Sequence, residues 1–183
     1  MQFQARIGSV ATMVAIATIL SSAPAVSSAQ GTAAAKLDDP TIVAIFDAAN
    51  TYDIETGSLA ARKGSSTAVR DFGEMIARDH RNVRQQGRDL ARSLNVTPTP
   101  PSDFALAAQH AEAMKSLRSK SGRDFDRAFL QHEVDFHNAV IDAVTKTLLP
   151  AIQNAQVKDL VTKVAPAFVA HRDRAQNILN DLR

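Results

Sequence analysis

The sequence predicts an all-α protein, an antiparallel four-helix bundle with an extra short helix in the crossover between the second and third long helices. Apolar residues recur at three- and four-residue spacing along four long segments, which is typical of helices that bury one face. Proline, glycine and capping residues separate these segments. No segment shows the period-two alternation of a half-buried strand. Long helices joined by short corners favour a bundle.

The first two helices are bounded by clear start and stop signals. We expect Asp39 to cap the first helix, with Pro40 at its first helical position. The run 63–66 (Lys-Gly-Ser-Ser) ends this helix and caps the next, which extends from about Thr67 to Leu94. The following segment, 95–101, contains three prolines, which cannot continue a helix and favour an extended connection.

The remaining helices follow the same logic. A short helix is expected from about Asp103 to Arg118. The run 121–124 (Ser-Gly-Arg-Asp) resembles a capping box and opens a long helix to about Leu148. A corner containing proline follows, and the last helix runs from about Gln156 to Leu182 with a kink expected at Pro166.

The segment 1–29 has the three regions of a secretory signal peptide. Arg6 is the only charged residue before Lys36, and a mainly apolar run, 7–20, follows it. Small residues then lead to a small-x-small cleavage pattern at 27–29 (Ser-Ser-Ala). The apolar run is shorter than the ~20 residues that span a bilayer. We therefore expect the segment 1–29 to be cleaved and the protein to reside in the periplasm.

Cleavage would leave the segment 30–183, an ordinary length for one domain. We expect 30–38 to be a flexible N-terminal segment and 39–183 to be a single helical-bundle domain. The chain contains no cysteine, so neither a disulfide nor lipid attachment to cysteine is expected. No later stretch is long and apolar enough to span a membrane, so we expect no transmembrane segment in the mature chain.

The charge balance argues against a nucleic-acid partner. The whole chain carries 21 Lys and Arg against 19 Asp and Glu, and cleavage of the signal peptide would remove only Arg6 from this balance. The arginines at positions 78, 81, 84 and 88 lie near Asp79 and Asp89 on the second helix, which indicates a solvated face. The few aromatic residues do not interleave with them as a stacking platform requires.

Histidines occupy core positions on three of the predicted helices. His80 and His171 each take the place of an apolar residue in a long apolar stripe, and His137 follows Glu133 by four residues on the third long helix. Asp53 shares the apolar face of the first helix. A polar group in a core costs stability unless it is paired, so a repeated polar core position indicates a shared site.

The number of residues between each group and the corner of its hairpin indicates that the two groups of a hairpin lie at similar heights along the bundle axis. Asp53 and His80 lie on either side of the corner near Ser65, and His137 and His171 lie on either side of the corner near Gln153. In each hairpin the two distances along the chain differ by about two or three positions, which is ~3–4.5 Å of axial rise. Whether the two hairpins share one height depends on the proline-rich crossover, which the sequence leaves open.

Together His80, Glu133, His137, His171 and Asp53 offer imidazole and carboxylate ligands, a set that suits zinc, copper, iron or manganese. Asp79 and His132 flank this set, and we expect them to orient the ligands or to lie at the rim. His110 is expected at the surface. The alternative is that each buried histidine bonds to a carboxylate on a neighbouring helix, forming a polar network that fixes helix register.

Four segments in order resemble the bacterial domain-of-unknown-function family four-one-four-two, often described as "predicted outer membrane protein". They are Phe72–His80, His132–Asp142, Leu149–Asn154 and Pro166–His171. The resemblance covers about Asp39 to Leu182 and implies a ferritin-like bundle exported to the envelope, where any membrane association would be peripheral. The chain lacks the Glu-x-x-His pairs of diiron ferritin-like enzymes, which favours a mononuclear or structural site.

Two function classes follow. The first is a periplasmic protein that binds a transition metal through the bundle core. The second is a structural or protein-interaction module of the envelope whose histidines form the polar network. An enzymatic role is less favoured, because there is no cysteine and the serines cluster at helix caps and in the signal region. The sequence does not determine the oligomeric state.

Overall fold

The computed structural model describes residues 37–101 and 104–182, and these residues form helices and connecting segments without a strand. The predicted signal peptide, 1–29, and residues 30–36 of the predicted flexible segment lie outside the described residues. None of the described helices combines the length and the apolar character needed to cross a membrane. The elements are α1 (Asp39–Lys63), α2 (Thr67–Ser93), α3 (Ala105–Ser119), α4 (Gly122–Ala143), the π-helix η1 (Val144–Leu148), α5 (Leu149–Ala151) and α6 (Ala155–Asp181).

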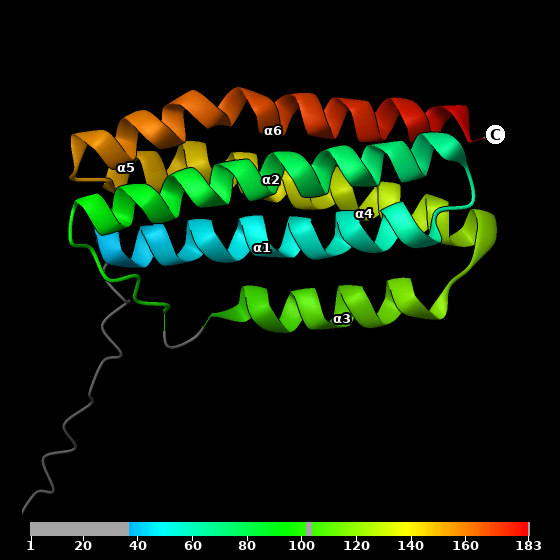
Figure 1. Cartoon of the computed structure of the whole chain (residues 1–183), viewed down its shortest axis with the longest axis horizontal. Coiled ribbons are helices and arrows are strands. Elements are labelled where there is room, and N and C mark those ends of the chain that lie inside the picture. Colours follow the sequence, from blue (N-terminus) through cyan, green and yellow to red (C-terminus); the bar gives the residue numbers. More distant parts are fainter. Residues whose placement is uncertain (1–36, 102–103, 183) are drawn as a thin grey trace, which may run out of the picture. The chain divides into compact units, whose positions relative to one another are not determined.

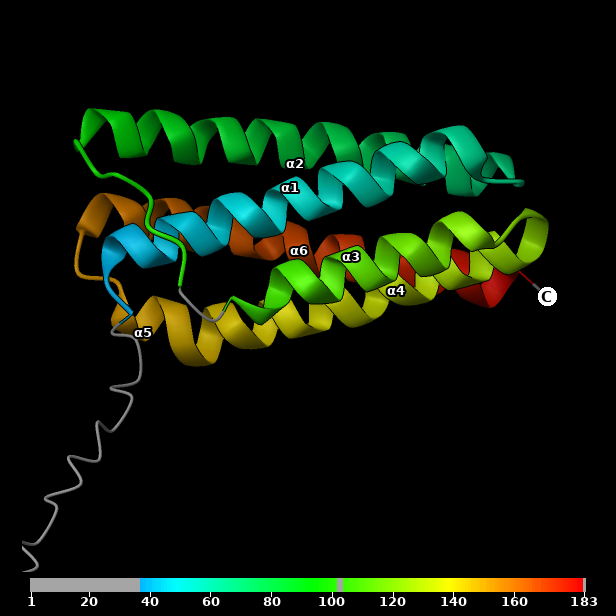
Figure 2. The same ribbon diagram turned by 90° about the horizontal axis from the view of Figure 1, so that it is seen from below.

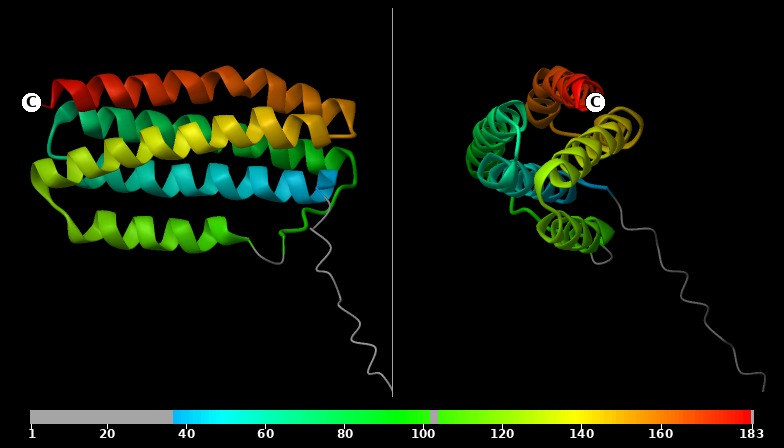
Figure 3. Two further views of the ribbon diagram at one scale, coloured as in Figure 1. Left: turned by 180° about the vertical axis from the view of Figure 1, so that it is seen from behind. Right: turned by 90° about the vertical axis from the view of Figure 1, so that its right-hand side faces the viewer.

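Four long helices, α1, α2, α4 and α6, lie side by side (Figure 1). Helix α1 runs opposite to α2, and α4 runs opposite to α6, whereas α2 and α4 run in the same direction. The most extensive packing is between α1 and α2 and between α4 and α6, and α1–α4 and α2–α6 contacts join the two pairs. The end-on view in Figure 3 shows α3 outside the four, against α1 and α4. In Figure 2, α3 runs along the domain and carries the chain from the end where α2 stops to the end where α4 begins.

The start of α1 differs from the sequence prediction by one residue. Asp38, not Asp39, is the N-cap, and its carboxylate accepts the backbone N–H of Thr41 at 3.0 Å. The prediction was wrong because proline suits either of the first two helical positions, whose N–H groups have no partner within the helix. Asp39 instead accepts the backbone N–H groups of Gln153 and Asn154 at 2.9 and 2.8 Å. It thereby ties the start of α1 to the corner before α6.

The predicted capping box at the start of α4 is also wrong. The Ser121 side chain makes no capping hydrogen bond, and Gly122 opens the helix with a positive φ of 57°. Glycine tolerates this conformation because it has no Cβ. At the other end the expected continuous helix to Leu148 passes into the π-helix η1 after Ala143.

A polar layer divides the hydrophobic core into two apolar clusters. One cluster contains Phe46 of α1, Ala91 of α2, Val144 of η1 and Phe168 of α6. The other contains Ala60, Ile76, Leu130 and Ala175 from α1, α2, α4 and α6. On each of the four long helices the buried polar residues other than Thr41 and Asp126 lie between these positions. They are Asn50, Asp53, Thr56, His80, Glu133, His137 and His171.

Two glycines set the spacing of α1 and α2 beside this layer. A Cβ added to Gly57 would lie 2.8 Å from the carbonyl oxygen of Gly73, and one added to Gly73 would lie 2.6 Å from that of Gly57. Backbone atoms cannot yield to such contacts, so both positions require glycine. Gly57 follows Asp53 by one helical turn, and the close approach therefore helps to hold Asp53 against α2.

Candidate metal centre

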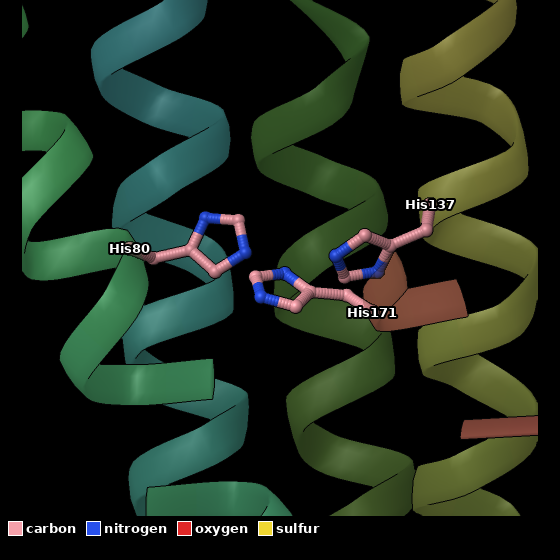
Figure 4. Close-up of side chains that lie close together, drawn as sticks. All are labelled: His80, His137 and His171. Carbon is pink, nitrogen blue, oxygen red and sulfur yellow. The ribbon is translucent and has the colours of Figure 1, made fainter. Parts of the chain in front are cut away.

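The five predicted ligands come together from four different helices. Asp53 lies on α1, His80 on α2, Glu133 and His137 on α4, and His171 on α6. The three imidazole rings point toward one another (Figure 4), with ring centroids 5.1 to 5.6 Å apart. The two helical hairpins therefore share one height at this layer, a question that the sequence alone left open.

Two groups of ligand atoms have the spacing of a metal site. In the first group, three ring nitrogens, one each from His80, His137 and His171, lie within 4.8 Å of one another. The same limit holds for one atom each from Asp53, Glu133 and His137, so His137 belongs to both groups. All five residues are at most 6 % exposed. Ligands that bind at ~2.0–2.2 Å from a common ion must lie within about 4.4 Å of one another, so a small inward movement would complete either group.

Asn50 fixes the tautomer of His80. The amide nitrogen of Asn50 donates to the carbonyl oxygen of Phe46 at 2.8 Å, which leaves its Oδ1 as the acceptor for Nδ1 of His80 at 2.9 Å. Nδ1 of His80 therefore carries the proton, and Nε2 keeps its lone pair. An outer partner that orients an imidazole in this way is typical of a metal-ligating histidine.

His137 and His171 are oriented in the same manner. Nδ1 of His137 lies 2.9 Å from the backbone carbonyl of Glu133, which can only accept, so Nδ1 donates and Nε2 is free. Nε2 of His171 lies 3.4 Å from Oδ2 of Asp79, which leaves Nδ1 of His171 free. Each of the three rings thus has one nitrogen bonded to an outer acceptor and one unprotonated nitrogen.

The five candidate ligands all carry a buried atom without a hydrogen-bond partner. Within the described residues the buried side-chain atoms of this kind are Oδ1 of Asp53, Nε2 of His80, Oε2 of Glu133, Nε2 of His137 and Nδ1 of His171. An unsatisfied buried polar group costs about 1–3 kcal/mol. Five such groups in one layer are a large cost beside the net stability of a typical domain, about 5–15 kcal/mol. A site that leaves one free acceptor on each of five converging residues is suited to a cation.

The electrostatics of the layer agree with this chemistry. Burial raises the pKa of Asp53 well above its usual value, and the neighbouring Glu133 raises it further. Burial raises the pKa of Glu133 to about 8, against the hydrogen bond from Thr56 at 2.8 Å. Burial lowers the pKa of His137 to about 3, and burial together with the other two imidazoles lowers that of His80. The imidazoles are therefore neutral and able to ligate, whereas the carboxyls must lose protons to a cation.

The flanking residues fall into two places. Asp79 is half-buried and contacts both His171 and the exposed Arg78, so it lies at the edge of the site and orients one ligand. His132 lies against Phe136, with ring centroids 5.8 Å apart, in a surface pocket that it shares with His110. Its place in that pocket is at the rim, away from the three converging rings.

His110 was predicted at the surface, and the structure places it in this surface pocket with most of its side chain covered. Its side chain is only 10 % exposed, because the ring stacks on Tyr52 at 4.2 Å and Nε2 bonds to Glu55 at 2.8 Å. The position of α3 against α1 covers the ring.

Asn50 and Thr56 were not among the predicted site residues. Both are buried on α1, three residues before and after Asp53, and they contact His80 and Glu133 respectively. Their spacing from Asp53 places them on the same helical face. That polar run within an apolar face is a signal that could have indicated them.

Comparison with known proteins identifies a family but no characterised relative. Neither the curated proteins nor the solved structures contain a significant match to the chain. A family model covers the whole polar layer and most of the chain. This model, described as "Domain of unknown function (DUF4142)", matches residues 23–178, and the chain therefore belongs to that family.

Proposed function

We propose that this protein is exported to the periplasm and binds one transition-metal ion in the polar layer. Nitrogen ligands would come from His80, His137 and His171, and oxygen ligands from Asp53 and Glu133. The observation that carries the proposal is the set of five unpartnered buried atoms on these residues. An ion in either group of three would satisfy its atoms at once, which no pairwise bond among neutral imidazoles can do.

The charge and the tautomers favour a single divalent ion. Two carboxylates balance the charge of one divalent cation, so the filled site is neutral and no net charge is buried. His137 has one free nitrogen, because its other nitrogen donates to the Glu133 carbonyl. It can therefore ligate one ion, although it belongs to both ligand groups. Imidazole and carboxylate ligands suit zinc, copper, iron and manganese.

The fold and location complete the proposal. The packing of the four long helices supports a ferritin-like four-helix bundle, with α3 as the extra helix in its long crossover. The apolar run and cleavage pattern before Gln30 support export. We infer a role in metal storage, delivery or envelope stress, with any association with the outer membrane being peripheral.

Metal analysis of the full chain, expressed with its own leader, tests the proposal. The purified protein is stripped with a chelator, dialysed against Zn²⁺, Cu²⁺, Fe²⁺ or Mn²⁺ separately, and analysed for metal per chain. We expect about one ion per chain for at least one metal and nearly none for His137→Ala. His110→Ala, which changes a histidine outside the layer, should bind as the wild type does. Failure of every metal to bind, or full binding by His137→Ala, would contradict the proposal.

A second function is favoured by one observation. Two of the three histidines bond across helices, His80 to Asn50 of α1 and His171 to Asp79 of α2, so the layer already links α1, α2 and α6 as a polar network. A structural or interaction module of the envelope would need only this network. It predicts that His137→Ala lowers the melting temperature equally with and without metal, whereas the metal site predicts that metal stabilises the wild type alone.

A further inference from the structure

A cleft opens beside the first half of α1, between this helix, α2 and the proline-containing segment 95–101. It has a volume of about 430 Å³. Pro98 and Pro100 form part of its wall, and the backbone N–H of Thr99 donates to the carbonyl oxygen of Pro40 at 3.1 Å, which holds this wall to α1 (Figure 2). Among the described residues that line the cleft, none is one of the five candidate metal ligands. A ligand bound here would therefore be independent of the metal proposal.

Most of the lining is apolar. Apart from three charged residues, the described lining consists of apolar side chains and one glycine. Val43 and Phe46 line the cleft from α1, and Phe104 lines it from the segment that precedes α3. Gly87 of α2 leaves room beside Phe46, because a Cβ at this position would lie 3.1 Å from the Phe46 ring. Apolar walls with a few convergent polar groups are typical of pockets for small organic ligands.

The three charged residues are accessible and leave hydrogen-bond donors unused. They are Asp47 of α1 and Arg84 and Arg88 of α2, whose side chains are 26, 27 and 45 % exposed. Arg88 donates to both carboxylate oxygens of Asp47, through Nε and Nη2. Arg84 donates to Oδ1 of Asp47 through Nε alone, at 3.3 Å. Within the described residues, the two terminal nitrogens of Arg84 are therefore free to donate to a ligand.

The charges of the lining leave room for one anionic group. Burial opposes ionisation of Asp47, but the hydrogen bonds and charges of Arg88 and Arg84 outweigh it and lower the pKa of Asp47 below its ordinary value. Asp47 is therefore ionised at neutral pH and cancels one of the two guanidinium charges. One positive charge remains in the described lining. A carboxylate balances this charge, and its two oxygens match the paired terminal N–H groups of a guanidinium.

The volume gives the size of the apolar part of a ligand. A cavity of about 150 Å³ accommodates benzene, so about 430 Å³ accommodates on the order of 17 heavy atoms. Polar groups along the body of the ligand would find no partner on the apolar walls. We propose that this cleft binds a medium-chain fatty acid, with its carboxylate on the terminal nitrogens of Arg84 and its alkyl chain against the phenylalanines and prolines of the lining.

Calorimetric titration of the full chain with sodium octanoate tests the proposal. The protein is first stripped of metal, so that the carboxylate cannot bind to an ion in the polar layer. Octylammonium and 1-octanol have the same chain with a positive and a neutral head group. We expect saturable binding of octanoate, at least tenfold tighter than that of either of these two probes. Absence of saturable octanoate binding, or equal binding of 1-octanol, would overturn the proposal.

Variants of two lining residues locate the binding site. Arg84→Gln should weaken octanoate binding at least tenfold, and Arg84→Lys, which keeps the charge without the paired N–H groups, should have an affinity between those of Arg84→Gln and the wild type. Arg81→Gln changes an exposed arginine of α2 outside the cleft and is the matched control, with wild-type affinity expected. Ala48→Phe fills the cleft without changing either arginine and should also weaken binding at least tenfold. Wild-type affinity in Arg84→Gln or in Ala48→Phe would place the fatty acid elsewhere and overturn the proposal.

Discussion

Two buried carboxylates on one face of α4, Asp126 and Glu133, have opposite surroundings. Asp126 is 1 % exposed and accepts three hydrogen bonds at the start of α2, from the backbone N–H and hydroxyl of Ser65 and from the backbone N–H of Ser66. Glu133 is fully buried and accepts one, from Thr56, while its Oε2 has no partner. The two residues are seven positions apart, two helical turns.

The difference shows that burial of a charged group does not by itself identify a functional site. The carboxylate of Asp126 is satisfied by the α1–α2 corner and holds that corner to α4. The carboxyl of Glu133 keeps an unused acceptor in a layer where four other residues do the same. Unused hydrogen-bonding capacity is therefore what separates the candidate site from structural polarity.

The largest expected effect is the loss of Asp126. Asp126→Ala removes three hydrogen bonds and leaves the Ser65 and Ser66 N–H groups without their acceptor, so we expect the free energy of unfolding to fall by about 3 kcal/mol. Denaturant unfolding with and without metal measures this loss, which should be the same in both. A loss that metal reverses would contradict the structural role of Asp126.

The next effect concerns the pH dependence of the metal-free protein. The folded pKa of Glu133, about 8, lies above its usual value of 4.5, so its burial costs stability once the unfolded chain ionises. The histidines act in the opposite sense, because the lowered pKa of His137 makes stability rise from about pH 3 to 6.5. Between pH 6.5 and 8 the carboxyl effect remains, and we expect stability to fall by about 2 kcal/mol.

Glu133→Gln isolates this effect. The variant cannot ionise at this position, so its stability should fall less between pH 6.5 and 8. Glu74→Gln, an exposed residue of α2, should keep the wild-type profile. Urea unfolding at several pH values measures the curves. An unchanged profile in Glu133→Gln would show that Glu133 is not protonated in the folded protein.

The smallest expected effect is that of Thr56→Val. It removes the hydroxyl that bonds to Glu133 at little change in volume, and should cost about 1 kcal/mol at neutral pH. Because this bond lowers the pKa of Glu133, its loss should extend the decline in stability to higher pH. Thr51→Val removes a hydroxyl bond to the Asp47 carbonyl on the same helix and serves as the control. Coincident pH profiles for the two variants would contradict the prediction.

The sequence predicted the helices and the facing of the site residues, but not how the hairpins meet. Helical spacing placed His80 and His171 inward, because each interrupts a regular apolar stripe. Whether the two hairpins share one height depends on the connection between α2 and α4. The prolines in this connection do not determine where α4 begins along the bundle axis. The structure answers this through α3, which spans the domain before α4 begins.

Local errors have local reasons. The cap moved from Asp39 to Asp38 because two adjacent acids before a proline satisfy the same pattern. Ser121 was predicted to cap α4, but its side chain makes no capping hydrogen bond, and the helix begins at Gly122 with a positive φ. Asn50 was not predicted because asparagine has no titratable group, although its amide orients His80.

The π-helix η1 has a consequence for the phase of the sequence. Beyond His137 the apolar residues recur every four positions, at Val140, Val144, Leu148 and Ile152, and all of them belong to or pack against one apolar cluster. In a regular α-helix each four-residue step overshoots a full turn by about 40°, so three steps would rotate the stripe by about 120°. An underwound turn absorbs this drift. The four-residue spacing of the apolar residues thus matches η1. A one-residue deletion there would place Ile152 eleven positions after Val140, about 20° beyond three full turns of a regular α-helix, so Ile152 would still face the core that it now completes.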